Sequence, residues 1–268
     1  MRLSYKSEIL TEGIADGLVR RGWDTFPSKD PGRDLVLGKA DLVLAPAIDY
    51  SRHLGAVDYA LVPEFAILAS GFAGVMRIAF LPGREDFRRI AVRSLDDDAV
   101  LIAGIILLEK HGIEPEFIEV ASGLDLPLML ESADGALLSG DDALASLAFH
   151  PYALDLADEW EDLTEQPLPY MLAWGKRGAV SQVAIEEFQS ARDDAARELP
   201  DLAARHARPE AVEKAFERYL SGAIRYSIAR GEADEIFNPL FHFAFYHGII
   251  SDIPSILYLP LEADERTL

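Results

Sequence analysis

Short runs of apolar residues alternate, along the first third of the chain, with segments whose apolar residues recur at helical spacing. Ile14 and Leu18 lie one helical turn apart before Gly22, which predicts a helix at about 11–21. The apolar runs predict short strands at 34–37, 42–45, 59–63, 66–69, 77–81 and 90–92. Alternation of this kind is typical of a mostly parallel sheet covered by helices, so the pattern predicts an α/β fold.

The middle of the chain continues the alternation and contains the clearest helix. Residues 96–111 begin with three aspartates, continue as an apolar body and are followed by Gly112. Ser94 is expected to cap this helix, and acidic side chains in a first turn offset the helix dipole. The alternative for the three aspartates is a divalent-cation site, because carboxylates are ligands for such ions. A strand, a helix and another strand are predicted after it, at 117–120, 124–130 and 135–138.

The last third of the chain changes to long amphipathic patterns, which predict helices at 182–198, 209–225 and 233–247. Two segments are candidates for crossings between lobes: 80–87, which is rich in Pro and Gly, and 167–178, where an extended stretch passes into helices. Two crossings imply that one lobe is inserted into the other. We therefore predict a discontinuous lobe one at 1–85 and 175–268 and an inserted lobe two at 86–174.

Composition narrows the classes of function. The 268 residues carry 46 acidic against 25 basic side chains, a formal net charge of -21, which disfavours nucleic acid and anionic membrane surfaces as partners. Cysteine is absent, so disulfides and thiolate metal sites are excluded. The sequence begins without a signal-peptide pattern and has no window apolar enough for a membrane span, from which we expect a cytoplasmic protein.

The sequence lacks the usual signatures of nucleotide, zinc and serine-nucleophile chemistry, including GxGxxG, the Walker loop, HExxH and GxSxG. The six histidines are scattered, and His242 and His247 are five residues apart, a spacing that puts them on different faces of a helix. We therefore expect neither nucleotide nor zinc chemistry.

Several blocks of the sequence nevertheless resemble one known family. LSY at 3–5 is similar to the opening segment VSYLNT of chorismate dehydratase, the first enzyme of the futalosine route to menaquinone, and KADLVLAPAIDYSR at 39–52 is similar to its DLALIPSIEY block. ADGALLSGDDAL at 133–144 and LDLADEWEDLTEQPLPYMLAW at 154–174 resemble two central blocks of the same family at the same spacing. The resemblance covers most of the chain.

The resemblance implies a two-lobed fold of the type II periplasmic-binding-protein kind, with a central cleft and a helical C-terminal third. It also implies removal of water from chorismate, an anionic cyclic carboxylate, to give 3-[(1-carboxyvinyl)oxy]benzoate without a metal or cofactor. The residues expected to bind the substrate are Ser4, Tyr5, Lys6, Ser7, Ser70, Ser94 and Tyr152. Ser7 and Asp141 are the candidates for catalysis, and the catalytic base is not identified.

The sequence departs from the family where a substrate anion would bind. The family's SxTS segment opens the helix of the second lobe, and an ungapped alignment puts Asp96, Asp98 and Ala99 at its serine, threonine and serine. Carboxylates there would repel a dianion by about 1 kcal/mol per charge at close approach in water. The family's opening asparagine falls at Ser7, the apolar residue before it at Lys6, and a further serine at Val75.

These departures leave two alternatives to the lyase. One is a non-catalytic solute-binding or sensing protein of the same fold, which would close on a less anionic ligand. The other is the later pathway enzyme that makes 1,4-dihydroxy-6-naphthoate, although its Pro-Asn-Asp segment is missing from this chain.

Overall fold

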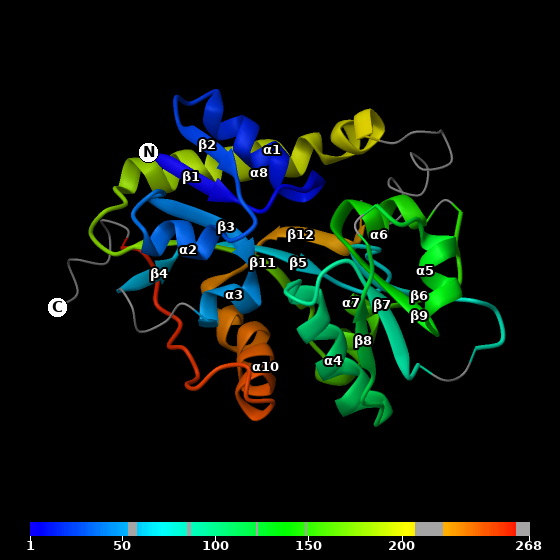
Figure 1. The fold of residues 1–268 in the computed structure, drawn as a ribbon. Coiled ribbons are helices and arrows are strands. Elements are labelled where there is room, and N and C mark those ends of the chain that lie inside the picture. Colours follow the sequence, from blue (N-terminus) through cyan, green and yellow to red (C-terminus); the bar gives the residue numbers. More distant parts are fainter. Residues whose placement is uncertain (53–57, 85–86, 122, 148, 207–221, 261–268) are drawn as a thin grey trace. The chain divides into compact units, whose positions relative to one another are not determined.

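A computed structural model describes residues 1–52, 58–84, 87–121, 123–147, 149–206 and 222–260 (Figure 1). The chain divides into two compact units. Unit 1 contains Met1–Leu68, Pro169–Leu202 and Arg225–Leu268, and unit 2 contains Ala69–Leu168 and Ala203–Ile224. Each unit is built on one of two sheets.

The sheet of unit 1 has the strand order β12-β5-β11-β3-β1-β2, with β4 paired to β11. The strands are β1 Arg2–Tyr5, β2 Asp24–Pro27, β3 Leu42–Pro46, β4 Tyr59–Leu61, β5 Phe65–Ala69, β11 Leu168–Lys176 and β12 Ile224–Ser227. β1 pairs in parallel with β2 and β3, whereas β11 runs antiparallel to β3. The helical elements are α1 Ile9–Val19, α2 Pro31–Val36, α3 Ala47–Arg52, α8 Gln182–His206, η1 Arg230–Glu232 and α10 Ala233–Tyr246.

The sheet of unit 2 has the strand order β10-β6-β9-β7-β8. These strands are β6 Met76–Phe80, β7 Arg89–Val92, β8 Glu116–Glu119, β9 Gly135–Ser139 and β10 Ala153–Asp155. β7 pairs in parallel with β8 and β9, while β6 runs antiparallel to β9. The helices are α4 Asp98–His111, α5 Leu126–Ser132, α6 Gly140–Ser146 and α7 Leu156–Thr164.

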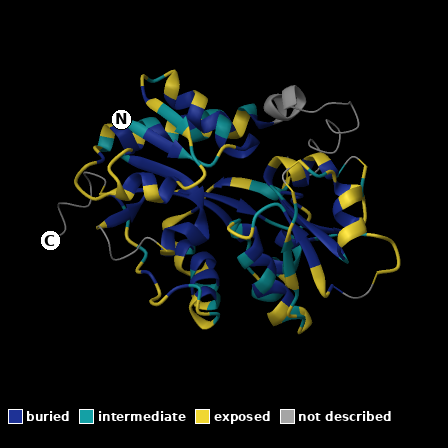
Figure 2. Ribbon diagram, viewed as in Figure 1, coloured by how far each residue is buried: buried dark blue, intermediate teal, exposed yellow. Residues whose placement is uncertain are grey.

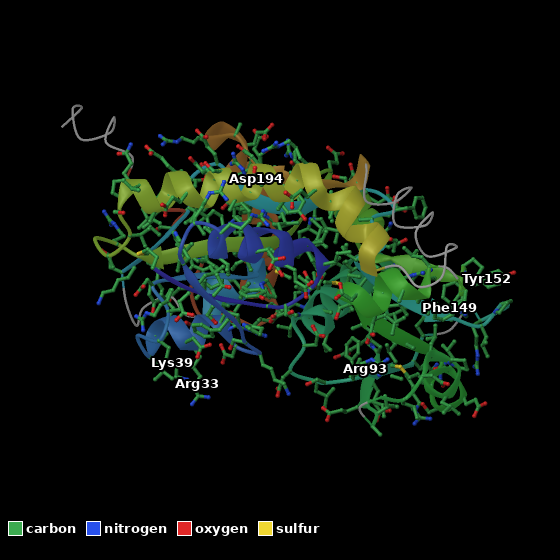
Figure 3. The ribbon with its side chains drawn as sticks, turned by 90° about the horizontal axis from the view of Figure 1, so that it is seen from above. Arg33, Lys39, Arg93, Phe149, Tyr152 and Asp194 are labelled. Atoms are coloured by element: carbon green, nitrogen blue, oxygen red, sulfur yellow. The ribbon has the colours of Figure 1, made fainter. Side chains whose placement is uncertain are left out.

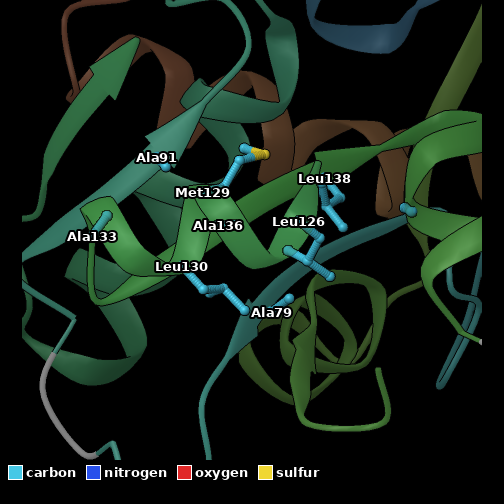
Figure 4. Close-up of a cluster of buried hydrophobic side chains, with 9 residues drawn as sticks. Ala79, Ala91, Leu126, Met129, Leu130, Ala133, Ala136 and Leu138 are labelled. Carbon is cyan, nitrogen blue, oxygen red and sulfur yellow. The ribbon is translucent and has the colours of Figure 1, made fainter. Parts of the chain in front are cut away.

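The core of each unit lies along its sheet, where every residue of β3 and β5 is buried (Figure 2). In unit 2, α5 packs its apolar side on the sheet. Met129 and Leu130 of α5 join Ala91 and Ala136 of the sheet in one buried cluster (Figure 4). Small alanine side chains on the strands leave room for the long side chains of the helix, so helix and sheet approach closely.

Most of the predicted strands are present within a residue or two, but the one at 34–37 is wrong. These residues lie in and just after helix α2. Asp30 caps that helix by accepting a hydrogen bond from the Arg33 backbone N–H (2.9 Å), and Pro31 occupies its first turn. A side-chain cap followed by proline starts a helix, and the short apolar run does not override it.

The helices of the C-terminal third are present in the part that the structure describes, but their bounds differ from the predicted ones. α8 continues to His206, beyond the predicted end at 198. Most of the helix predicted at 209–225 lies outside the described residues, but its last two residues belong to strand β12, which pairs with β5.

The first boundary between the units differs from the crossing expected at 80–87. The change of unit comes between Leu68 and Ala69, and β6 and β7, on either side of 80–87, are strands of the same sheet. The second boundary falls between Leu168 and Pro169, within the segment 167–178.

Candidate functional site

Two parallel strands of unit 2 end beside a hollow in that unit. Because β7 and β9 pair in parallel, their carboxyl ends lie at the same edge of the sheet. The hollow is small, with a cavity volume of about 30 Å³, and it opens to solvent. It is lined by Val92, Arg93, Ser94, Asp97, Val100, Leu137, Leu138, Ser139 and Asp142. Open α/β sheets bind ligands outside the carboxyl ends of their strands, so this strand-end pocket is the candidate site.

Asp97 starts helix α4 at one side of the strand-end pocket. Its backbone is extended (φ -69°, ψ 129°), and its Oδ1 accepts a hydrogen bond from the Ala99 N–H (3.0 Å). Its Oδ2 accepts a second hydrogen bond from the Ser139 hydroxyl (2.9 Å). The cap is therefore Asp97 and not Ser94, and the first helical residue is Asp98. The carboxylate of Asp97 stabilises the positive end of α4 from within the protein.

Arg93 provides positive charge at the same pocket. It follows the last residue of β7 and is labelled in Figure 3. Its Nε lies 2.6 Å from Asp142 Oδ2, and its Nη1 donates a hydrogen bond to the Leu124 carbonyl (3.0 Å). The contact with Asp142 is an ion pair without hydrogen-bond geometry, so the Leu124 carbonyl orients the guanidinium, while 34% of the side chain stays exposed. A fixed and accessible guanidinium is a good partner for a carboxylate.

Of the site residues predicted in unit 2, only Ser94 lines the strand-end pocket. Its Oγ accepts a hydrogen bond from the Asp96 N–H (3.2 Å). Asp141 lies in the first turn of α6, but the residue of α6 that lines the pocket is its neighbour Asp142. Tyr152 is half exposed, and its carbonyl accepts from the N–H of Phe80; Figure 3 labels it well apart from Arg93.

Ser70 lies in the loop between β5 and β6. Its N–H donates to the Ala223 carbonyl (2.9 Å). The same loop is held by acidic side chains, because the Gly71 N–H donates to Glu161 (2.7 Å) and the Gly74 N–H donates to Asp155 (2.7 Å). The loop backbone is thus bound to α7 and to the residue that caps it.

Asp155 is the most strongly perturbed acid of unit 2. Only 7% of its surface is exposed, and burial raises the pKa of its carboxyl to about 6. Hydrogen bonds from the N–H groups of Gly74 and Ala157, together with the charge of Arg77, act against that rise in pKa. Its contacts are with its own loop and helix, so it serves the structure of unit 2.

The predicted residues of unit 1 lie at the end of β1, but they differ in burial and in their hydrogen-bond partners. Ser4 is fully buried, and its hydroxyl donates to Asp34 Oδ2 (3.0 Å), so it anchors α2. Tyr5 ends the strand half-buried, and burial raises the pKa of its hydroxyl. The Lys6 backbone N–H donates to Leu44 (3.0 Å), and the exposed Ser7 hydroxyl donates to Glu12 (3.1 Å).

Glu8, next to these residues, is a buried acid that sequence reasoning missed. It is 4% exposed at the start of α1, and its Oε2 accepts a hydrogen bond from the Tyr170 hydroxyl of β11 (2.9 Å). Its backbone N–H donates to Thr11 Oγ1 (3.2 Å). The contacts join the end of β1 to α1 and β11, which is a structural role in unit 1.

Sequence reasoning also missed three polar pocket residues: Arg93, Ser139 and Asp142. The sequence contained a signal for two of them, because Ser139 and Asp142 lie in the SGDD turn of the block at 133–144 that resembles chorismate dehydratase. Arg93 lies in no recognisable sequence motif. Its place in the pocket follows from the parallel pairing of β7 and β9, which puts the carboxyl ends of both strands at the same edge of the sheet.

Within the described residues, no group of three or more His, Cys, Asp or Glu side chains is placed to hold a metal ion. The three aspartates at 96–98 lie at the start of α4, with Asp97 as the cap and Asp98 as the first helical residue. Among the same described residues, no helix has both the length and the apolar character that crossing a membrane requires.

Comparison with known proteins gives a family and a fold. The model of a family described as menaquinone biosynthesis matches residues 32–234, more than half of the chain. A solved protein from Archaeoglobus fulgidus matches with a TM-score of 0.64 at 18% identity, over 93% of this chain and 98% of its own.

Two further solved structures share the fold at low identity. A Candida albicans protein, described as having the generic periplasmic binding protein fold, matches with a TM-score of 0.63 at 10% identity, over 97% of both chains. The alkanesulfonate-binding protein SsuA of Xanthomonas axonopodis pv. citri, bound to MOPS, gives 0.60 at 14% identity, over 97% of this chain and 96% of its own. The predicted α/β, two-lobed binding-protein fold is confirmed.

Proposed function

We propose that this chain, which belongs to the menaquinone biosynthesis family, is a carbon–oxygen lyase that removes water from chorismate to give 3-[(1-carboxyvinyl)oxy]benzoate. The observation that carries the proposal is the family match over residues 32–234, which includes the whole strand-end pocket. The sequence blocks at 133–144 and 154–174, which resemble chorismate dehydratase, support the same reaction.

The lining of the strand-end pocket suits a small ring compound that carries a negative charge. Val92, Val100 and Leu137 offer apolar surface, and Ser94 and Ser139 offer hydroxyl groups beside the guanidinium of Arg93. Ligand sites commonly combine an apolar wall with a few convergent polar groups. Chorismate has an apolar ring, carboxylates and a hydroxyl, so its chemistry matches this set.

The proposed reaction breaks one C–H and one C–O bond. The ring carbon that bears the enolpyruvyl ether loses a proton, and the neighbouring carbon loses its hydroxyl group, so that one water leaves and the ring becomes aromatic. No electrons are gained or lost overall. The protein's part is to hold the carboxylates so that the departing groups face the base and the acid, and positioning of this kind contributes much of an enzyme's rate.

The test is direct. Purified protein is incubated with chorismate, and the mixture is separated by chromatography to look for the 3-substituted benzoate. Heat-unfolded protein and a parallel incubation with shikimate, a cyclic carboxylate, are the controls. Product that depends on folded protein and on time supports the lyase, and its absence at high protein concentration would exclude it.

A second candidate is a non-catalytic small-molecule-binding protein. The observation that favours it is the acidic start of α4, where Asp97 caps the helix and its neighbours Asp96 and Asp98 stand at positions that carry hydroxyl groups in the resembled enzymes. The matched solved structures include an alkanesulfonate-binding protein, which supports a small-molecule ligand. Saturable binding of chorismate in calorimetry without turnover would favour this candidate over the lyase.

A further inference from the structure

We infer that Arg93 is the residue that binds a carboxylate of the ligand in the strand-end pocket, and that it sets the preference of the pocket for carboxylates over neutral groups. The inference deepens the proposed function and rests on it for the identity of the natural substrate. Its own evidence is the charge and contacts of the pocket.

The first step concerns the N-terminus of α4, where helix N–H groups could bind a ligand anion. A helix start with free N–H groups and a nearby hydroxyl would bind an anion from solution. Here Asp97 supplies that anion from the chain itself, since its two oxygens accept from the Ala99 N–H and from the Ser139 hydroxyl. A ligand carboxylate at that place would have to compete with a carboxylate that is covalently held in position.

The second step is the charge that is left for a ligand. Among the described residues that line the pocket, Arg93 is the one cationic side chain, and Asp97 and Asp142 are the two anionic ones. Asp97 is already engaged with the helix start, and 54% of the Asp142 side chain is exposed, where solvent weakens its repulsion of an anion. Arg93 is therefore the group in this pocket that attracts a carboxylate.

The third step is geometry. The Leu124 carbonyl accepts a hydrogen bond from Nη1 of Arg93, and Asp142 forms an ion pair at Nε without hydrogen-bond geometry, so one hydrogen bond and one ion pair hold the guanidinium. A guanidinium has five N–H donors in a rigid plane, and these contacts leave donors for a carboxylate. Because its orientation is set before the ligand arrives, little conformational entropy is lost on binding. Asp142 is a positioning residue in this arrangement.

The experiment compares benzoate with benzamide, which have the same ring but differ in charge. Binding of each is measured by calorimetry for the wild type, Arg93→Gln, Arg93→Lys and Arg89→Gln. Arg89 is the matched control because it lies on the same strand β7, is 55% exposed and is not part of the pocket lining. Circular dichroism checks that each variant is folded.

We expect the wild type and Arg89→Gln to prefer benzoate by about 10-fold or more, and Arg93→Gln to lose that preference, because a hydrogen bond to a charged group contributes about 10- to 100-fold in affinity. Arg93→Lys should keep part of the preference, since an ammonium carries the charge but lacks the planar fork. Equal binding of both probes by the wild type, or an unchanged preference in Arg93→Gln, would overturn the inference.

The same variants separate this inference from the proposed function. If the wild type converts chorismate, Arg93→Gln should raise KM by about 10- to 100-fold, whereas Arg89→Gln should not. If the wild type binds benzoate through Arg93 but does not convert chorismate, the lyase is wrong and the carboxylate site stands. If chorismate is converted equally well by Arg93→Gln, the lyase stands and the assignment of Arg93 is wrong.

Discussion

Replacing Asp155 by asparagine should change how the stability of the protein depends on pH. Asp155 caps α7, and its two oxygens accept hydrogen bonds from the N–H groups of Gly74 (2.7 Å) and Ala157 (3.1 Å). It is almost fully buried, and burial raises its pKa from 3.8 to about 6. Asparagine has nearly the same shape, but it cannot ionise and offers one acceptor oxygen in place of two.

The raised pKa fixes the sign of the effect. The folded state holds the Asp155 proton more tightly than the unfolded state, so this carboxyl stabilises the fold fully below pH 3.8, and the stabilisation is lost as pH rises through about 6. The shift of the pKa corresponds to about 3 kcal/mol in total. Linkage gives a loss of about 1.4 kcal/mol between pH values of roughly 5 and 8.

The assay is urea denaturation at a series of pH values, followed by circular dichroism. The free energy of unfolding of the wild type minus that of Asp155→Asn should fall by about 1.4 kcal/mol from roughly pH 5 to roughly pH 8, because only the wild type titrates at this position. Asp125→Asn is the matched control, since Asp125 caps α5 in the same unit but lies in solvent. A difference that stays constant or grows with pH would refute the reasoning.

Three further substitutions test other parts of the structure by the same denaturation assay. Ser4→Ala should cost about 1–2 kcal/mol, because the buried carboxylate of Asp34 loses a donor, while KM for chorismate should not change. Gly175→Ala should cost about 1–3 kcal/mol, since the added Cβ would lie 2.9 Å from the Asp41 carbonyl oxygen. Met129→Ala should cost about 2–5 kcal/mol by leaving a cavity under α5. An unchanged stability in any of them would contradict the packing described for that residue.

Fully apolar runs were enough to find most strands of both sheets. β3 and β5 are buried on both faces, so their sequences are continuous apolar runs bounded by polar or turn residues. The run at 34–37 has the same appearance but is mostly helical, because Asp30 and Pro31 determine the conformation before the apolar residues are reached. Leu37, at its end, is exposed, and a hydropathy pattern alone does not reveal that.

The site was harder to predict than the fold, because each side chain depends on distant partners. Ser4 and Tyr5 are neighbours in sequence, but side chains alternate across a strand. Ser4 therefore meets Asp34 of α2 and is fully buried, which no local motif indicates. Arg93 is similar, since its orientation depends on Asp142, 49 residues later, and on the Leu124 carbonyl.

The acidic run at 96–98 shows how one structural detail changes a functional argument. On the sequence alone, the three carboxylates are equivalent charges that repel a dianion. In the structure, Asp97 turns back to cap α4 and accept from Ser139, so its charge is partly neutralised by the helix start and a hydroxyl. Repulsion is therefore weaker than three free carboxylates would produce, but the helix start is also no longer open to a ligand.

A protein of this family that keeps an anionic substrate must then attract it with a side chain in place of helix N–H groups. A side chain needs support to be held in one orientation, and the carboxylate that supports Arg93 also offsets its charge. The Asp142 carboxylate thus helps to hold the Arg93 guanidinium in place, but it also weakens the attraction of that guanidinium for a ligand anion. The preference of the wild type for a carboxylate over an amide should accordingly depend on Arg93 and be reduced by salt, because the Arg93–Asp142 pair is partly exposed.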